Sequence, residues 1–77
     1  MKFFFVSSES KEALKAKDEL IKEYGQNNID DADVIIPLGG DGFLLKSLHD
    51  YKKLNKPFYG INYGSIGFLM NNVHKEN

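Results

Sequence analysis

Apolar and polar stretches alternate along the 77 residues in a way that predicts two helices set between three short strands. Residues 2–6 include three phenylalanines and a valine, which favour a first strand. Residues 8–24 repeat apolar side chains every three or four positions, the period of an amphipathic helix. Ser8 is placed to cap the start of this helix and Gly25 to end it.

The second half of the chain repeats the pattern with a more apolar strand. Residues 32–38 are mostly apolar and branched, which is typical of a strand buried on both faces of a parallel sheet. A helix is predicted at 43–51, and a short strand at 58–61 after Pro57. The order β-α-β-α-β indicates one small α/β domain, or part of one, with a parallel sheet between helices in three layers.

Composition and charge narrow the classes of partner. Ten basic and eleven acidic residues give a net charge of −1. The sequence has no basic stripe interleaved with aromatic residues, so we expect no nucleic-acid partner. The absence of cysteine excludes a disulfide framework and a thiolate zinc site, and it fits the reducing cytoplasm, where we expect this protein. A metal, if bound, is expected to use oxygen ligands. The apolar run at 3–6 is far too short to span a membrane, and we expect no membrane partner.

The sequence Gly-Gly-Asp-Gly at 39–42 comes directly after the predicted buried strand. In open α/β sheets the ligand crevice lies outside the carboxyl ends of the strands. Glycines let backbone N–H groups approach a phosphate, and the start of a helix favours an anion. A carboxylate there repels phosphate unless it holds magnesium or accepts a proton from a hydroxyl, and both tasks belong to phosphoryl transfer. The alternative is a structural turn in which Asp41 caps the next helix.

A second Gly-rich loop, residues 62–69, follows the last predicted strand, and six of the seven glycines fall between Gly39 and Gly67. Because parallel strands end at the same edge of a sheet, the two loops are expected to line one crevice.

The two motifs, Gly-Gly-Asp-Gly at 39–42 and Gly-Ile-Asn-Tyr-Gly-Ser-Ile-Gly-Phe-Leu at 60–69, together resemble the amino-terminal domain of the NAD kinases. The first is shared with diacylglycerol kinases, sphingosine kinases and 6-phosphofructokinases, whereas the second is specific to NAD kinases. The resemblance covers nearly all of residues 1–77. It implies an incomplete amino-terminal domain without its carboxy-terminal β-rich domain, and therefore a segment that is inactive by itself.

The resemblance also implies the chemistry: transfer of a phosphoryl group from ATP, or polyphosphate, to the adenosine ribose 2′-hydroxyl of NAD, assisted by a divalent metal such as Mg. Asp41 matches the catalytic residue that accepts the hydroxyl proton. The resemblance assigns no metal ligand, implies a homo-oligomer, and places Phe43 where most members have threonine. The residues that it implies for NAD and ATP binding are Gly39, Gly40, Asp41, Gly42, Lys46, Asn62 and Phe68.

Two other functions stay open at the level of sequence. A diacylglycerol-type lipid kinase shares the first motif, although it would need a different second loop. A noncatalytic nucleotide-binding module would use both Gly-rich loops as structure, with Lys46 a solvated side chain and Asn62 a turn-supporting one. The phosphoryl donor and the preference for NAD over NADH are not determined by these residues.

Overall fold

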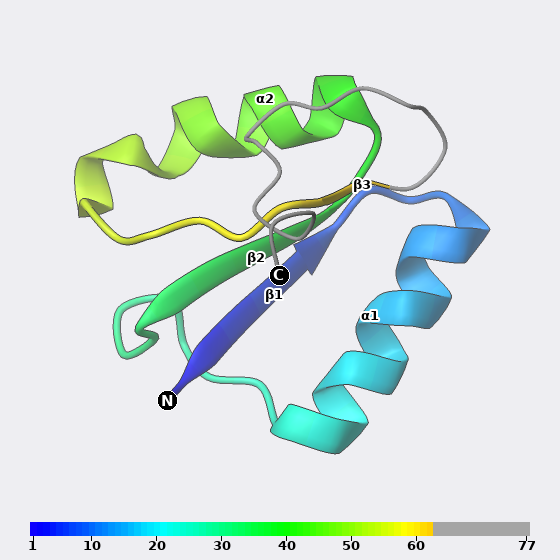
Figure 1. Cartoon of the computed structure of the whole chain (residues 1–77), viewed down its shortest axis with the longest axis horizontal. Coiled ribbons are helices and arrows are strands. Elements are labelled where there is room, and N and C mark those ends of the chain that lie inside the picture. The colour runs from blue at the N-terminus through cyan, green and yellow to red at the C-terminus, as the bar shows by residue number, and fades with distance from the viewer. Residues whose placement is uncertain (63–77) are drawn as a thin grey trace.

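Three parallel strands form one sheet in residues 1–62, the part of the chain that the computed structural model describes (Figure 1). The strand order is β1-β2-β3, so β2 is the central strand. The elements follow the predicted order: β1 (Phe3–Ser7), α1 (Lys11–Tyr24), β2 (Val34–Gly39), α2 (Asp41–Tyr51), a 3-10 helix η1 (Lys52–Leu54) and β3 (Ile61–Asn62).

The helices cover opposite faces of the sheet, which confirms the three-layer α/β prediction (Figure 1). On one face, Ala13 of α1 is buried against Phe5 of β1 and Leu38 of β2. On the other face, the ring of Tyr51 in α2 meets that of Phe4 edge-on, with centroids 6.1 Å apart. Five of the six residues of β2 are buried, as expected for a central strand.

The placement of the helices has a consequence for chain topology. Both crossovers, β1-α1-β2 and β2-α2-β3, move in the same direction across the sheet. Two right-handed crossovers of this kind would put both helices on one face, and right-handed crossovers are the strong rule. Because α1 and α2 lie on opposite faces, one of the two crossovers has the uncommon left hand.

Helix α1 begins two residues later than its expected cap. Ser8 was expected to cap it, but Ser8 continues the β1 edge by donating its backbone N–H to the Leu38 carbonyl at 2.9 Å. Ser10 is the N-cap instead, and its hydroxyl accepts from the Ala13 N–H at 3.2 Å. Gly25 ends the helix as predicted, with a φ of 83° that favours glycine.

Strand β3 is short because of a proline in its neighbour. The backbone of Ile35 faces β3: its N–H donates to the Pro57 carbonyl, and its carbonyl accepts from Tyr59. The next residue of β2 that faces β3 is Pro37, which has no N–H to donate. The predicted strand at 58–61 is therefore split into a bridge at Phe58 and the two residues of β3.

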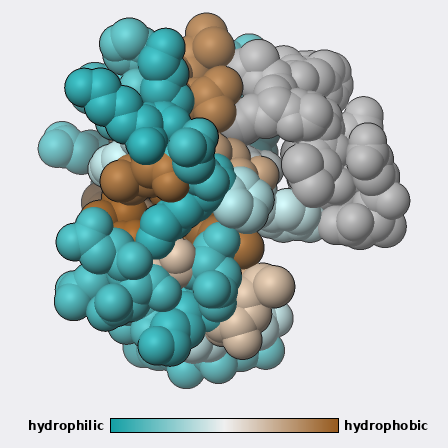
Figure 2. Space-filling view, turned by 90° about the vertical axis from the view of Figure 1, so that its left-hand side faces the viewer, coloured by the Kyte–Doolittle hydropathy of each residue, from teal (hydrophilic) through white to brown (hydrophobic). Residues whose placement is uncertain are grey.

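Lys56, before β3, ties this segment to the one that precedes β2. Its ammonium donates to the carbonyls of Ile29, Asp30 and Ala32 at 2.7–2.8 Å. Figure 2 views this end of the molecule, where hydrophilic side chains cover most of the surface and apolar ones show between them. Within residues 1–62, none of the helices is long and apolar enough to cross a membrane.

Candidate active site

The carboxyl ends of β2 and β3 bring the two motifs together. Gly39, the last residue of β2, is the register partner of Asn62, the last residue of β3. Asp41 follows two residues after Gly39 and starts α2. The expected meeting of the two Gly-rich segments at one sheet edge is thus confirmed as far as Asn62, and residues 63–69 of the second loop lie outside the described residues.

A side-chain hydrogen bond joins the two polar residues of this edge. The amide nitrogen Nδ2 of Asn62 donates to Oδ1 of Asp41 at 2.5 Å, across 21 residues of sequence. Both side chains are half-buried. Asp41 is the first residue of α2 and Gly40 is its N-cap, so the alternative in which Asp41 caps the helix is wrong. The carboxylate is held by the neighbouring strand instead of by its own helix.

The start of α2 presents backbone donors that have no acceptor within residues 1–62, beside this carboxylate. The first intrahelical bond runs from the Leu44 N–H to the Gly40 carbonyl at 3.0 Å, and the amides before it have no acceptor within the helix. The N-cap Gly40 contributes no side-chain bond to them. These amides and the positive end of the helix dipole together favour a bound anion such as a phosphate.

Packing requires glycine at one position of the turn and does not require it at another. A Cβ on Gly39 would lie 2.8 Å from Cδ2 and 3.0 Å from Cβ of Phe43, so the aromatic ring requires a glycine there. A Cβ on Gly42 would meet no described atom within 4 Å, and this residue is exposed in the first turn of α2. Packing within residues 1–62 therefore explains Gly39 and leaves Gly42 without a reason, as expected where a ligand approaches the backbone closely.

Lys46 is not brought to Asp41 and Asn62. Its ammonium lies 2.9 Å from the Asp50 carboxylate one turn along α2, and its side chain is 71% exposed. The hydrogen bond and the charge of Asp50 raise the pKa of Lys46 above its ordinary value. Phe68, the predicted binding residue near the end of the second Gly-rich loop, lies outside the described residues.

The side chains of residues 1–62 do not converge on a metal ion. No group of three or more His, Cys, Asp or Glu residues in this part of the chain is close enough to hold one. Residues 1–62 therefore contain no dedicated protein cage for a metal ion, whereas Mg²⁺ is commonly held by one or two carboxylates together with substrate phosphates.

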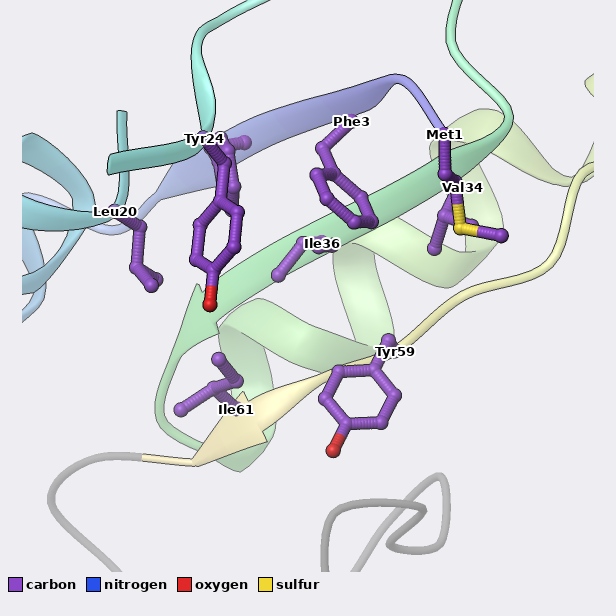
Figure 3. A pocket seen from close by; sticks show the side chains of 9 residues that line it. Met1, Phe3, Leu20, Tyr24, Val34, Ile36, Tyr59 and Ile61 are labelled. Atoms are coloured by element: carbon purple, nitrogen blue, oxygen red, sulfur yellow. The ribbon is translucent and has the colours of Figure 1, made fainter. Parts of the chain in front are cut away.

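An apolar cavity of about 420 Å³ lies on the α1 face of the sheet (Figure 3). Its wall includes Phe3 and Tyr24, whose rings meet edge-on at 5.6 Å, and Tyr59 from the segment before β3. Asp41 is not part of this wall. Sequence reasoning did not predict the cavity, although the apolar residues at alternate strand positions were visible. The full lining is Met1, Phe3, Phe5, Leu20, Tyr24, Val34, Ile36, Tyr59 and Ile61.

Comparison with known proteins decides the family. The family model for the ATP-NAD kinase N-terminal domain matches residues 2–77. The chain belongs to the ATP-NAD kinase family. The chain is 51% identical over 73 residues to an NAD kinase of Brucella suis biovar 1 (strain 1330), which covers 95% of this chain and 28% of the relative.

Two further relatives agree with this family. An NAD kinase of Rhizobium meliloti (strain 1021) is 49% identical over 73 residues, or 95% of this chain. An NAD kinase of Xylella fastidiosa (strain 9a5c) is 47% identical over 72 residues, or 94% of this chain. The chain spans 28% of the length of each. Membership in the ATP-NAD kinase family confirms the resemblance and does not favour a lipid kinase or a noncatalytic module.

Proposed function

We propose that the protein of which this chain forms part is an NAD kinase, which transfers a phosphoryl group from ATP to NAD and makes NADP. Two observations support the proposal: the family to which residues 2–77 belong, and the Asp41 carboxylate held at the carboxyl edge of the sheet by Asn62. The second observation carries the chemistry, because phosphoryl transfer to a hydroxyl needs a positioned proton acceptor.

In this mechanism Asp41 accepts the proton of the adenosine ribose 2′-hydroxyl. The ribose oxygen forms a bond to the γ-phosphorus of ATP while the bond from that phosphorus to the ADP oxygen breaks. Gly39, Gly40 and Gly42 form the turn against which the dinucleotide lies, and the free amides at the start of α2 face its anionic or polar groups. Asn62 and Phe68 belong to the same pocket in this proposal, whereas Lys46 would have to leave Asp50 to join it.

The remaining parts of the proposal concern partners and setting. Magnesium would arrive with ATP and neutralise charge on its phosphates, and no step above depends on it. Residues 1–77 form an amino-terminal domain of a larger enzyme, and turnover requires the rest of that enzyme. The protein acts in the cytoplasm as a homo-oligomer, without nucleic acid or membrane partners; a cysteine-free chain of net charge −1 is compatible with this setting.

The test is NADP formation from NAD and Mg-ATP by the full-length protein and its Asp41→Asn variant. We expect turnover to fall by about 10²- to 10⁴-fold, the usual contribution of a positioned base, while NAD still binds. Asp18→Asn is the matched control, because Asp18 is an exposed carboxylate on α1, away from Asp41 and Lys46, and it should keep normal turnover.

Other results would replace the proposal. Phosphorylation of diacylglycerol, offered in a parallel reaction, would make the protein a lipid kinase. No product from either acceptor, together with NAD or ATP binding that Asp41→Asn leaves intact, would make it a noncatalytic nucleotide-binding module.

A further inference from the structure

The hydrogen bond from Asn62 to Asp41 bears on two possible roles of Asn62 that the sequence does not distinguish. A residue of the pocket can contact the dinucleotide directly, or it can act by holding another residue. The side-chain amide of Asn62 donates an N–H to Oδ1 of Asp41 at 2.5 Å. The structure therefore gives Asn62 a defined partner on the protein, and this partner is the proposed proton acceptor.

The backbone on both sides of this bond is fixed by the sheet. Asn62 ends β3 and is in register with Gly39 of β2, and Asp41 is anchored as the first residue of α2. Asparagine has a short side chain with few torsions, so a strand position of this kind places its amide accurately. The backbone position of the donor is set by strand pairing.

The same bond makes the two oxygens of Asp41 inequivalent. A carboxylate at the start of a helix usually turns back to bond its own first-turn amides. Here Oδ1 is held toward β3, which restricts the rotation of the carboxylate and leaves Oδ2 as the oxygen outside this bond. The first-turn amides of α2 are left for an anion because the carboxylate does not compete for them.

We propose that Asn62 is a positioning residue, which holds the Asp41 carboxylate in the orientation from which it accepts the proton of the ribose hydroxyl. The inference rests on the proposed NAD kinase function and deepens it. It assigns to Asn62 an effect on turnover that passes through Asp41, in place of a direct contribution to NAD affinity.

A double-mutant cycle on the full-length protein tests this role. The four proteins are the natural one, Asn62→Ala, Asp41→Asn and the double variant, and the readouts are single-turnover NADP formation and the KM for NAD. We expect Asn62→Ala to lower the rate about tenfold with the KM for NAD nearly unchanged, because a misoriented base loses part of its contribution. In the Asp41→Asn background the same change should cost nothing further.

The alternatives give different patterns. If Asn62 contacts NAD directly, Asn62→Ala should raise the KM for NAD several-fold in both backgrounds. If it contributes to catalysis independently of Asp41, Asn62→Ala should lower the rate equally in both. Either result overturns the inference, while NADP formation by the natural protein keeps the proposed function. No NADP from the natural protein removes both. Asn62→Leu, which keeps the size of the side chain but removes the donor, should match Asn62→Ala, and unchanged rates in it would also overturn the inference. Asn28→Ala, at an exposed asparagine before β2, is the control for an inert substitution.

Discussion

The side-chain amide of Gln26 pairs with the backbone of Phe5 as a neighbouring strand would. Its Oε1 accepts from the Phe5 N–H at 2.9 Å, and its Nε2 donates to the Phe5 carbonyl at 3.0 Å. Asn27 continues the pairing, since both its backbone N–H and its Nδ2 donate to the Phe3 carbonyl at 3.1 Å. The outer edge of β1 is therefore closed by two side-chain amides, which blocks the addition of a further strand there.

Removing the Gln26 amide should open this edge. We expect Gln26→Leu to lower the free energy of unfolding by about 1–2 kcal/mol, because it leaves the Phe5 N–H and carbonyl without partners. The exposed edge should also make the protein associate as its concentration rises. Denaturant titration measures the first effect, and sedimentation velocity over a concentration series measures the second.

Gln26→Glu serves as the comparison for this edge. It keeps an acceptor for the Phe5 N–H but turns an oxygen toward the Phe5 carbonyl. Its free energy of unfolding should therefore lie between those of the natural protein and Gln26→Leu. Equal stability of all three proteins would show that the amide pairing does not protect β1.

Gly39 and Gly42, two of the three glycines of the turn, should respond oppositely to substitution by alanine. Gly42→Ala is expected to raise the free energy of unfolding by about 0.5–1 kcal/mol, since Gly42 has a helical position and open space around its Cα. The same change should weaken NAD binding, because the methyl group enters the space proposed for the ligand. Thermal unfolding and NAD titration of the full-length protein together measure both effects.

Gly39→Ala should destabilise by about 1–3 kcal/mol, because the new methyl group overlaps the Phe43 side chain. Adding Phe43→Ala should recover part of this loss, since it removes the ring that the methyl group meets. A double variant as unstable as the sum of the single ones would contradict the overlap. For Gly42, a stable Gly42→Ala protein with unchanged NAD affinity would contradict the proposal that NAD lies against the backbone there.

Lys56 should contribute strongly to stability although it is a lysine near the surface. Lys56→Met removes three hydrogen bonds to the carbonyls of residues 29, 30 and 32, and we expect the free energy of unfolding to fall by about 2 kcal/mol. Lys53→Met, at an exposed lysine of η1, should change it by less than about 0.5 kcal/mol. Similar losses in the two variants would show that the carbonyl bonds are replaced by water at no cost.

The start of α1 can be located by alanine substitution. Ser10→Ala should cost about 1 kcal/mol in the free energy of unfolding, because the Ala13 N–H loses its cap. Ser8→Ala should cost clearly less, since Ser8 contributes to β1 through its backbone and its hydroxyl makes only a long, exposed bond of 3.4 Å to the Ser10 hydroxyl. Chemical denaturation of both variants checks the order, and a larger loss in Ser8→Ala would restore Ser8 as the cap.

Sequence periodicity was sufficient for the elements and insufficient for their ends. The apolar runs identify β1, α1 and β2 because strand and helix periods differ and because β2 is buried on both faces. The choice between Ser8 and Ser10 as the cap depends on how far β1 remains paired with β2. The interruption of β3 depends on which side of β2 Pro37 faces, and this side is set by strand pairing.

The candidate site shows the same division. The Gly-Gly-Asp-Gly sequence identified Asp41, and the strand that precedes it indicated the edge of the sheet where Asp41 lies. The sequence did not show that Asn62 would donate to Asp41, because the two residues are 21 positions apart. The pairing of Lys46 with Asp50 was visible as an i, i+4 spacing, but its competition with a role in the pocket required coordinates.

By itself the sequence determined the order of the elements, the burial of β2 and the position of Asp41 after it. These features depend on local period and on the residues of a single turn. Only the tertiary structure decided that α1 and α2 cover opposite faces, that Gln26 closes the edge of β1 and that Asn62 holds Asp41. Each of these arises where segments distant in sequence meet, and the strand order and crossover handedness that bring them together are not encoded in a local pattern.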